Sequence, residues 1–368
     1  MEVEKEKEKE KEKEKEKEEE KMEVDISEEE KLEKERLEKE KLEKKRLEDR
    51  FIEACTTNKV EEVRELVLNH GELDINCQED NTKRTGFHAA CQRGHLKIVQ
   101  LLINDPRLDI NKPTFNSSPF WDACREGHFE IVKLLIVDQR INVNQQEGYT
   151  NSPFCAACIK RQENVINLFF ESSRVDVNIA NRSNKTALSI ITTMGFTPII
   201  KLLLENEKVD VNKASLPGMS PFYIACDRGR IEIVKVYLDC MRVDINKTDK
   251  FGVSPLSVAA FNGHYEVVES MLLSGRSLNV NSKDNKGKSA IDFARTKEKT
   301  YQSDEEWKII RSNCDKIVGL LEPFAKDPNE AKIQFRIKHG LARNISFFFF
   351  FFLFSFSFFI FLFLLSLY

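Results

Sequence analysis

The chain has 368 residues, with 57 Lys or Arg against 61 Asp or Glu and a formal net charge of −4. Residues 51–368 hold 40 basic and 38 acidic side chains, a balance that argues against a nucleic-acid-binding domain, which is usually strongly basic. Nine cysteines follow an N-terminal run of charges that has no apolar stretch for secretion, so we expect reduced thiols, no disulfide framework and a cytoplasmic location.

The N-terminal part divides into two charged segments. Residues 1–27 are rich in Glu and Lys, low in complexity and without an apolar face to bury, which predicts disorder. Residues 28–50 predict a charged helix with pairs four residues apart, at Glu35 and Lys39 and at Glu40 and Lys44. Its leucines recur at every fifth residue and wind around the helix, so they form no coiled-coil seam. The sequence is consistent with two interpretations of this segment, a solvated helix or an arm that binds a partner.

A short block recurs seven times between residues 85 and 294. Each copy opens with Thr or Ser, often continues with Pro and a large apolar residue, and then runs into small residues. The openings are 33 to 35 residues apart and lie at Thr85, Ser118, Ser152, Thr186, Ser220, Ser254 and Ser289. Ser or Thr suits a helix N-cap, and Pro suits the first helical position. Small residues let helices approach closely, and this slot holds Cys55, Cys91, Cys124, Cys158 and Cys226.

Each block predicts one short helix, followed by a break and a second helix. The break is most often Gly followed by His or Arg, and apolar residues then recur at helical spacing, as at Ile98, Val99, Leu101 and Leu102. A third element is an extended stretch that ends at Asn76, Asn111, Asn144, Asn178, Asn212, Asn246 or Asn281. Because an Asn side chain can bond its own nearby backbone, we expect it to fix a turn that projects between repeats.

These blocks resemble the Thr-Pro-Leu-His-x-Ala block of the ankyrin-repeat family, which recurs about every 33 residues. The resemblance implies an all-α fold: an ankyrin-repeat solenoid of stacked helix-turn-helix units with projecting turns, about eight repeats over residues 51–324. The first repeat lacks the opening block. The last is expected to have a longer first helix, with Trp307, Ile310 and Leu320 in its second. Residues 325–346 are assigned to a linker.

Repeats four and five depart from the family pattern. Arg161 and Gln162 replace the Gly-His break, and larger or polar residues stand where small residues and His are usual, at Thr192, Thr193 and Phe196. We expect a kink or a special surface near residues 155–196. Most second helices also end without the usual Gly.

Candidate chemistry is limited to cysteines and histidines. Cys155 and Cys158 have the spacing of a zinc or redox pair, but no second pair follows at zinc-finger spacing and both lie in a helix-forming block, which favours core packing. Three histidines share one repeat position and are expected to cap or brace helices: His95, His128 and His264. There is no glycine-rich phosphate loop, His-Glu-x-x-His or Gly-x-Ser-x-Gly motif. We therefore expect no catalytic, metal-binding or cofactor-binding residues and a protein that is not an enzyme.

The resemblance also implies where a partner binds. In ankyrin-like proteins the concave face, made of the projecting turns and the outer surface of the first helices, usually holds a protein partner. The predicted function is therefore a protein-interaction scaffold or adaptor, a monomer that binds a protein of unknown identity and no nucleic acid. Aromatic residues with charged neighbours are typical of interface hot spots and select Phe115, Trp121, Arg125, Glu126, Tyr149, Tyr223, Asp227, Arg228, Phe251 and Phe261. The alternative is that some of these rings pack between adjacent turns.

Residues 347–368 form an apolar tail with twelve Phe. As a helix of roughly 33 Å the tail would cross a bilayer, with a basic cluster on the cytosolic side at Arg336, Lys338, His339 and Arg343. This pattern favours an alternative function, a tail-anchored membrane protein that displays the repeats to the cytosol. A T-rich gene stretch translated past an intron or a stop codon would give the same residues, and a merely insoluble tail is a third alternative. All three are open in the sequence.

Overall fold

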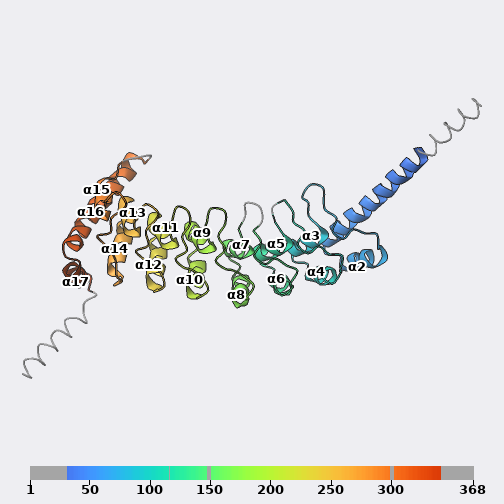
Figure 1. The fold of residues 1–368 in the computed structure, drawn as a ribbon, viewed down its shortest axis with the longest axis horizontal. Helices are drawn as coiled ribbons and strands as arrows, with labels where there is room; N and C mark the ends of the chain where they lie inside the picture. The colour runs from blue at the N-terminus through green and yellow to red at the C-terminus, as the bar shows by residue number, and fades with distance from the viewer. Residues whose placement is uncertain (1–30, 116, 147–150, 299–301, 341–368) are drawn as a thin grey trace, which may run out of the picture. The chain divides into compact units, whose positions relative to one another are not determined.

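Short antiparallel helix pairs follow one another along the chain in a computed structural model, which describes residues 31–115, 117–146, 151–298 and 302–340 (Figure 1). These residues form helices and turns, with no strand beyond a single bridge between Lys283 and Ser289. The fold is therefore the all-α solenoid of helix pairs that the sequence predicts. The chain divides into two units, residues 1–142 and 143–368, and each unit is described by itself.

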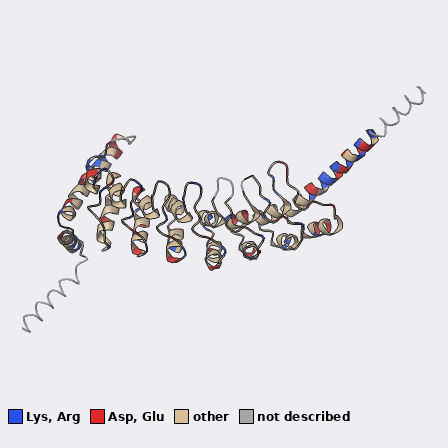
Figure 2. Cartoon of the chain, viewed as in Figure 1, with Lys and Arg blue, Asp and Glu red and all other residues tan. Residues whose placement is uncertain are grey.

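The first unit begins with a helix that is continuous from residue 31 to residue 56. It passes residue 51 without a break, so the charged segment and the first helix of the first repeat are one helix. Positive and negative side chains alternate along its early turns (Figure 2), where Leu32, Leu37 and Leu42 are exposed. Its ion pairs include Arg36 with Glu40 and Lys44 with Glu48, a different pairing from the one expected. The unit continues with α2 (Val60–Asn69), α3 (Gly86–Arg93), α4 (Leu96–Leu102), α5 (Pro119–Glu126) and α6 (Phe129–Ile136).

The second unit repeats the same helix pair. Its elements are α7 (Pro153–Lys160), α8 (Glu163–Glu171), α9 (Ala187–Met194), α10 (Thr197–Glu205), α11 (Pro221–Asp227), α12 (Ile231–Asp239), α13 (Pro255–Phe261), α14 (Tyr265–Leu273), α15 (Ala290–Arg295), α16 (Asp304–Lys326) and α17 (Pro328–Lys338). Within each unit the projecting turns lie on the side of the first helices, and the second helices lie on the opposite side (Figure 1).

The last repeat differs from the sequence prediction. Its first helix, α15, has six residues and is shorter than the other first helices, not longer, whereas α16 has 23 residues. Trp307, Ile310 and Leu320 lie in the second helix, α16, as the sequence predicts; they are half-buried, and the buried residues of this helix are Cys314, Ile317, Leu321 and Phe324. Residues 325–346, assigned to a linker, contain α17, whose Phe335 ring centre lies 5.6 Å from that of Phe324.

Two segments of the sequence prediction lie outside the described residues, the low-complexity run 1–27 and the apolar tail 347–368. None of the helices in the described ranges is both long and apolar enough to cross a membrane.

The first helices begin as the sequence predicts. In α3, α5, α7, α9, α11, α13 and α15 the hydroxyl of the preceding Ser or Thr accepts a hydrogen bond from the backbone N–H three residues later. Proline fills the first position of four of these helices, and the five cysteines of the repeat slot are fully buried. Because these contacts lie within one repeat or at its packed face, local sequence is enough to specify them.

The recurring asparagines do a different job from the one expected. The side chains of six of them bond the backbone of the following repeat. Asn212 Nδ2, for example, donates to Arg242 O at 2.7 Å, and its Oδ1 accepts from Asp244 N at 2.8 Å. The local turn is held by the Asp two residues earlier, since Asp210 Oδ1 accepts from Asn212 N. The same pair of bonds to the following repeat starts from Asn76, Asn111, Asn144, Asn178 and Asn246.

A recurring basic residue replaces the glycine that usually ends the second helix. The guanidinium of Arg242 donates to Leu204 O at 2.6 Å and to Asn206 O at 3.0 Å, where α10 ends. Arg276 does the same for α12 through Leu238 O and Cys240 O. A cation at a helix C-terminus donates hydrogen bonds to free carbonyls and interacts favourably with the negative end of the helix dipole. Arg107, Arg140 and Lys208 make equivalent bonds. In each case a basic side chain of one repeat caps the C-terminus of the second helix of the preceding repeat.

The histidines at the start of the second helices brace the repeats. His128 and His264 occupy the N-cap position but make no side-chain cap bond; their Nε2 atoms donate to Gln92 O at 2.9 Å and to Asp227 O at 3.0 Å in the preceding repeat. Their rings pack so closely on Gly94 and Gly229 that a Cβ there would lie within 2.6 Å of the ring. These two glycines also have positive φ, which excludes most other residues.

Candidate partner-binding face

In the first unit, the turn before α5 carries Phe115, whose side chain is 67% exposed as the sequence predicts. Trp121 follows on α5 and is half-buried, with the Arg125 guanidinium 5.6 Å from its ring centre. The same guanidinium lies 3.5 Å from the carboxylate of Glu126 and 3.6 Å from that of Asp122. The structure thus brings Trp121, Arg125 and Glu126 into one cluster on the first-helix side.

A buried polar network supports this cluster from below. His88 Nε2 lies 2.6 Å from Asp122 Oδ2, and Ser117 Oγ donates to the same oxygen at 3.0 Å. Burial of Asp122 by itself would raise the carboxyl pKa, but the bonds from His88 and Ser117 and the charge of Arg125 hold that pKa below its usual range. Ser117 and Asp122 both approach Nε2 of the histidine, whereas a catalytic triad places hydroxyl and carboxylate on opposite ring nitrogens. This network therefore orders α3 against α5.

In the second unit, the structure corrects the expectation for Tyr223. Its side chain is only 5% exposed. Tyr223 occupies the same repeat position on α11 as Trp121 on α5, where the tryptophan is half-buried. Burial raises the pKa of its hydroxyl, and the carboxylates of Asp249 and Asp227 raise that pKa further. Tyr223 holds α11 against the next projecting turn, so its ring is not a free anchor. Tyr149 lies outside the described residues.

Asp227 and Arg228 end α11 at the rim of this face. Asn262 Nδ2 donates to the backbone and side-chain oxygens of Asp227, both at 3.1 Å. Arg228 is exposed, with its guanidinium 3.9 Å from the Asp227 carboxylate. Burial lowers the pKa of His264, which donates to the Asp227 carbonyl. Asp227 is therefore occupied by contacts between repeats, while Arg228 is accessible to a partner.

Two aromatic side chains of the second unit are paired with lysines. Phe251 is 54% exposed at the tip of the turn before α13, with Lys250 Nζ 4.8 Å from its ring centre. Phe261 is half-buried; its ring meets that of Phe293 edge-on at 5.9 Å and has Lys297 Nζ 4.0 Å from its centre. Exposed and half-exposed rings beside cations fit a protein interface.

Sequence reasoning missed Phe293 and Lys297. Phe293 stands four residues after its capping Ser, where the two preceding repeats have Ile224 and Val258. Register alone could have singled it out as the largest side chain at that position. The contact between the Phe293 and Phe261 rings could not be predicted from the sequence, because the two rings come from neighbouring repeats.

The cysteines lie in the core. Eight of the nine are buried, and burial raises the pKa of the Cys155 thiol to about 12 and that of Cys158 well above its usual value. A nucleophilic or metal-binding cysteine needs the opposite shift, toward thiolate. Within the described ranges, no group of three His, Cys, Asp or Glu side chains is placed to hold a metal ion.

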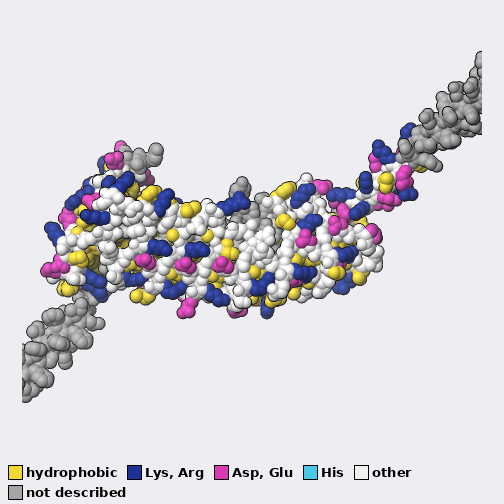
Figure 3. All heavy atoms as spheres, in the orientation of Figure 1, with side chains coloured by type: hydrophobic (Ala, Val, Ile, Leu, Met, Phe, Trp, Pro, Cys, Tyr) yellow, Lys and Arg dark blue, Asp and Glu magenta, His cyan; other side chains and the backbone are white. Residues whose placement is uncertain are grey.

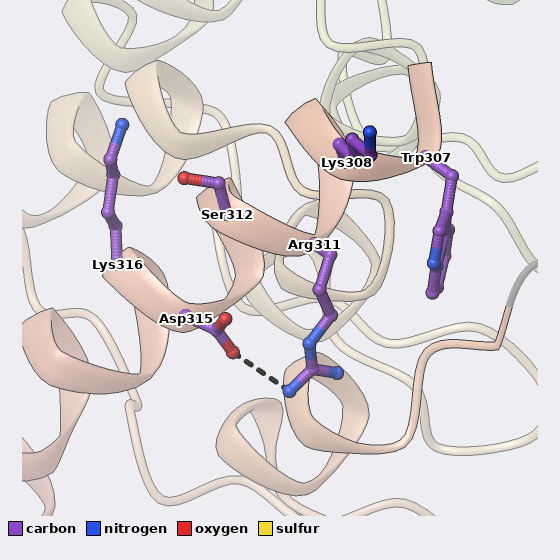
Figure 4. A pocket seen from close by; sticks show the side chains of 6 residues that line it. All are labelled: Trp307, Lys308, Arg311, Ser312, Asp315 and Lys316. Atoms are coloured by element: carbon purple, nitrogen blue, oxygen red, sulfur yellow. Dashed lines mark hydrogen bonds and ion pairs between the residues drawn. The ribbon is translucent and has the colours of Figure 1, made fainter. Parts of the chain in front are cut away.

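A hollow of about 610 Å³ lies along the outer surface of α16 (Figure 4). Trp307, Arg311 and Asp315 line it one helical turn apart, with Arg311 and Asp315 ion-paired at 2.8 Å. The other lining side chains are Lys308, Ser312 and Lys316. All six come from one helix, so the hollow lacks the enclosing walls of a small-molecule site.

Comparison with known proteins agrees with this architecture. A family model described as ankyrin repeats in three copies matches residues 51–147, 120–215, 154–249 and 222–300. A search of curated proteins found no match. Among solved structures, the crystal structure of the ankyrin repeat domain of Bcl-3, a unique member of the IkappaB protein family, is similar with a TM-score of 0.53 and 20% identity. That likeness covers 63% of this chain and 100% of that one, and at this identity it concerns the fold alone.

Proposed function

Because the chain belongs to the ankyrin-repeat family, whose repeats are generally protein-interaction modules, we propose that it is a non-enzymatic scaffold or adaptor that binds a protein partner on its projecting turns and first helices. The observation that carries this proposal is the exposure of Phe115 and Phe251. Each lies at the tip of a projecting turn, three residues before the capping Ser, and each exposes more than half of its side chain. Nothing in the packing of the described repeats requires an aromatic ring there.

The charged neighbours fit the same role. Arg125 and Glu126 flank Trp121 in the first unit, and Arg228 is exposed at the end of α11 in the second. Aromatic and arginine side chains contribute most of the binding free energy in typical protein interfaces. These residues therefore supply anchors in each unit, and Tyr223 is left out because it is buried.

The test is a pull-down from cell extract with the full-length tagged chain. We expect Phe115→Ala with Phe251→Ala to reduce capture of a specific partner by about tenfold or more, since truncating hot-spot residues typically costs 2 kcal/mol or more. A matched control is Leu68→Ala with Met241→Ala, two apolar residues outside the projecting turns that are more exposed than the two phenylalanines. Equal capture by the two double variants would rule out the proposed face.

For location we propose the cytoplasm, with the tail-anchored form as the alternative. The cysteine usage supports the first, and the composition of residues 347–368 supports the second. Alkaline carbonate extraction of the full-length chain separates them. Release into the supernatant would overturn the anchored form, and retention in the membrane pellet would overturn the purely cytoplasmic one.

A further inference from the structure

Four projecting turns of the second unit form a continuous row at the tips. These turns, called the basic turns below, are residues 181–185, 213–219, 247–253 and 283–288. Backbone hydrogen bonds join them in sequence: Leu216 N donates to Ser183 O at 3.4 Å, Lys250 N to Pro217 O at 3.0 Å, and Asn285 N to Phe251 O at 2.9 Å. Side chains add to the row, since Asn285 Nδ2 donates to Lys250 O. The row is therefore an ordered surface and not a set of independent loops.

Positive charge is concentrated on these turns. They hold eight Lys or Arg and two Asp, whereas the rest of residues 143–298 holds 12 Lys or Arg and 15 Asp or Glu. On the face drawn in Figure 3, by contrast, positive and negative side chains are interspersed over the second helices. The exposed basic side chains of the row are Arg182, Lys250, Lys283, Lys286 and Lys288.

The two acids of the row serve the turns themselves. Asp249 Oδ1 accepts from Phe251 N and Val253 N, both at 2.9 Å. Asp284 Oδ1 accepts in the same way from the N–H groups of Lys286 and Lys288. Among described residues, no carboxylate forms an ion pair with Lys250, Lys286 or Lys288. The ammonium groups of these three lysines are therefore available to a partner.

Apolar side chains stand between the charges. Leu216 is 64% exposed and Phe251 is 54% exposed, on neighbouring basic turns that share a backbone bond. A peptide segment bound across the row would contact lysine ammonium groups and the exposed apolar side chains alternately. We propose that the basic turns bind an extended acidic segment of the partner protein, with apolar side chains between its carboxylates. This inference rests on the proposed function and names the chemistry of the partner.

Charge distribution favours an acidic protein over a nucleic acid. Seven of the eight basic side chains are lysines, point charges that suit separate carboxylates, and Arg182 is the exception. The remainder of residues 143–298 is slightly acidic and would repel a long polyanion that extends beyond the row. Leu216, which is 64% exposed, is aliphatic and offers no ring for a base to stack on, so it fits an apolar side chain of a peptide better than a base.

The experiment measures fluorescence anisotropy of a labelled synthetic peptide in which Glu and Asp alternate with Leu and Phe. The full-length chain is expected to bind it, more weakly as salt is raised. Lys250→Glu with Lys286→Glu should weaken binding by about tenfold or more, because both side chains would then repel the peptide. The matched control is Lys201→Glu with Lys235→Glu, an equal charge change at exposed positions of α10 and α12. It should change affinity less than about twofold.

Equal weakening by both pairs would overturn the inference, because binding would then follow net charge alone. Tighter binding of single-stranded DNA or phosphatidylserine vesicles than of the peptide, lost in the Lys250→Glu, Lys286→Glu pair, would also overturn it. Circular dichroism of each variant checks that the fold is kept. If the chain fails to bind the peptide but captures a partner through Phe115 and Phe251, this inference fails and the proposed function stands.

Discussion

The guanidinium carbon of Arg161 lies 3.8 Å from the centre of the Phe196 ring, in the place where other repeats stack a histidine on a glycine. Gly94 lies under His128, and Gly229 lies under His264. Arg161 keeps the left-handed backbone of those glycines, with φ of 60°. At this point of the segment 155–196, where a kink or a special surface is expected, the two substitutions match each other: the Arg161 guanidinium packs on the Phe196 ring, whereas in the other two repeats a histidine ring packs on the backbone of a glycine.

The first prediction concerns this pair. Arg161→Gly removes the cation but relieves a backbone conformation that costs of the order of 1 kcal/mol, and Phe196→Leu removes the ring face but keeps apolar volume. If stacking links the two side chains, a double-mutant cycle should give a coupling free energy of about 0.5–2 kcal/mol in urea unfolding. The pair Lys133 and Phe129 on α6, in which an exposed ammonium group lies 5.9 Å from the ring centre, should show much less coupling. Additive losses at residues 161 and 196 would refute the stacking account.

The second prediction concerns the asparagine bonds. Asn212→Ala leaves Arg242 O and Asp244 N without their partner and should lower the free energy of unfolding by about 1–3 kcal/mol. Asn281→Ala is the control, because Asn281 makes one long bond, 3.4 Å to Ala325 O. Its effect should be below about 0.5 kcal/mol. Similar losses at both positions would mean that the paired bonds from asparagine to the following repeat contribute little to stability.

The third prediction concerns acid stability. Because the folded pKa of the Asp122 carboxyl is lowered, its stabilisation is complete above the unfolded pKa of about 3.9 and is lost as pH falls through the folded value. Below about pH 4 the unfolding free energy of the native chain should therefore fall more steeply than that of Asp122→Asn. Urea titrations at several pH values measure this slope. Asp239→Asn, at an exposed residue, should keep the native slope, and a native slope in Asp122→Asn would contradict the assignment.

The fourth prediction concerns thiol reactivity. Cys240 is the one half-buried cysteine, whereas the other eight are buried and burial raises the pKa of Cys77, for example, to about 12. Iodoacetamide at pH 8 should therefore label Cys240 first in the folded protein, with mass spectrometry as the readout. All nine should react in urea. Early labelling of Cys155 or Cys158 would indicate an accessible redox pair and contradict the core assignment.

The fold was largely predictable because its signals lie within one repeat. The capping Ser and Thr residues, the proline after them and the buried cysteines act over a few residues, so their period reveals the repeat and its helices. The short α15 and the added α17 were not predictable, because the end of a stack has no repeat pattern to extend.

Contacts between repeats were harder to predict. The series Arg107, Arg140, Arg174, Lys208, Arg242 and Arg276 recurs at the repeat spacing and could have been noticed. Its role could not, since the acceptors are backbone carbonyls about a repeat away. The candidate site shows the same division: Phe115 and Phe251 are exposed as predicted, whereas Tyr223 is buried and its hydroxyl meets Asp249 of the next turn, a contact between repeats.

The recurring side-chain hydrogen bonds that asparagine, arginine and histidine make between repeats have backbone atoms as partners. A carbonyl is present whatever the side chain, so a duplicated or transplanted repeat would find the same acceptors at its new neighbours. Such joints allow a stack to lengthen by gene duplication without compensating changes. Three contacts between repeats instead join two side chains: His88 with Asp122, Arg161 with Phe196 and Thr192 with Tyr237. Each needs a particular partner residue in the neighbouring repeat, so exchanging these repeats for others would lose the contact and lower stability.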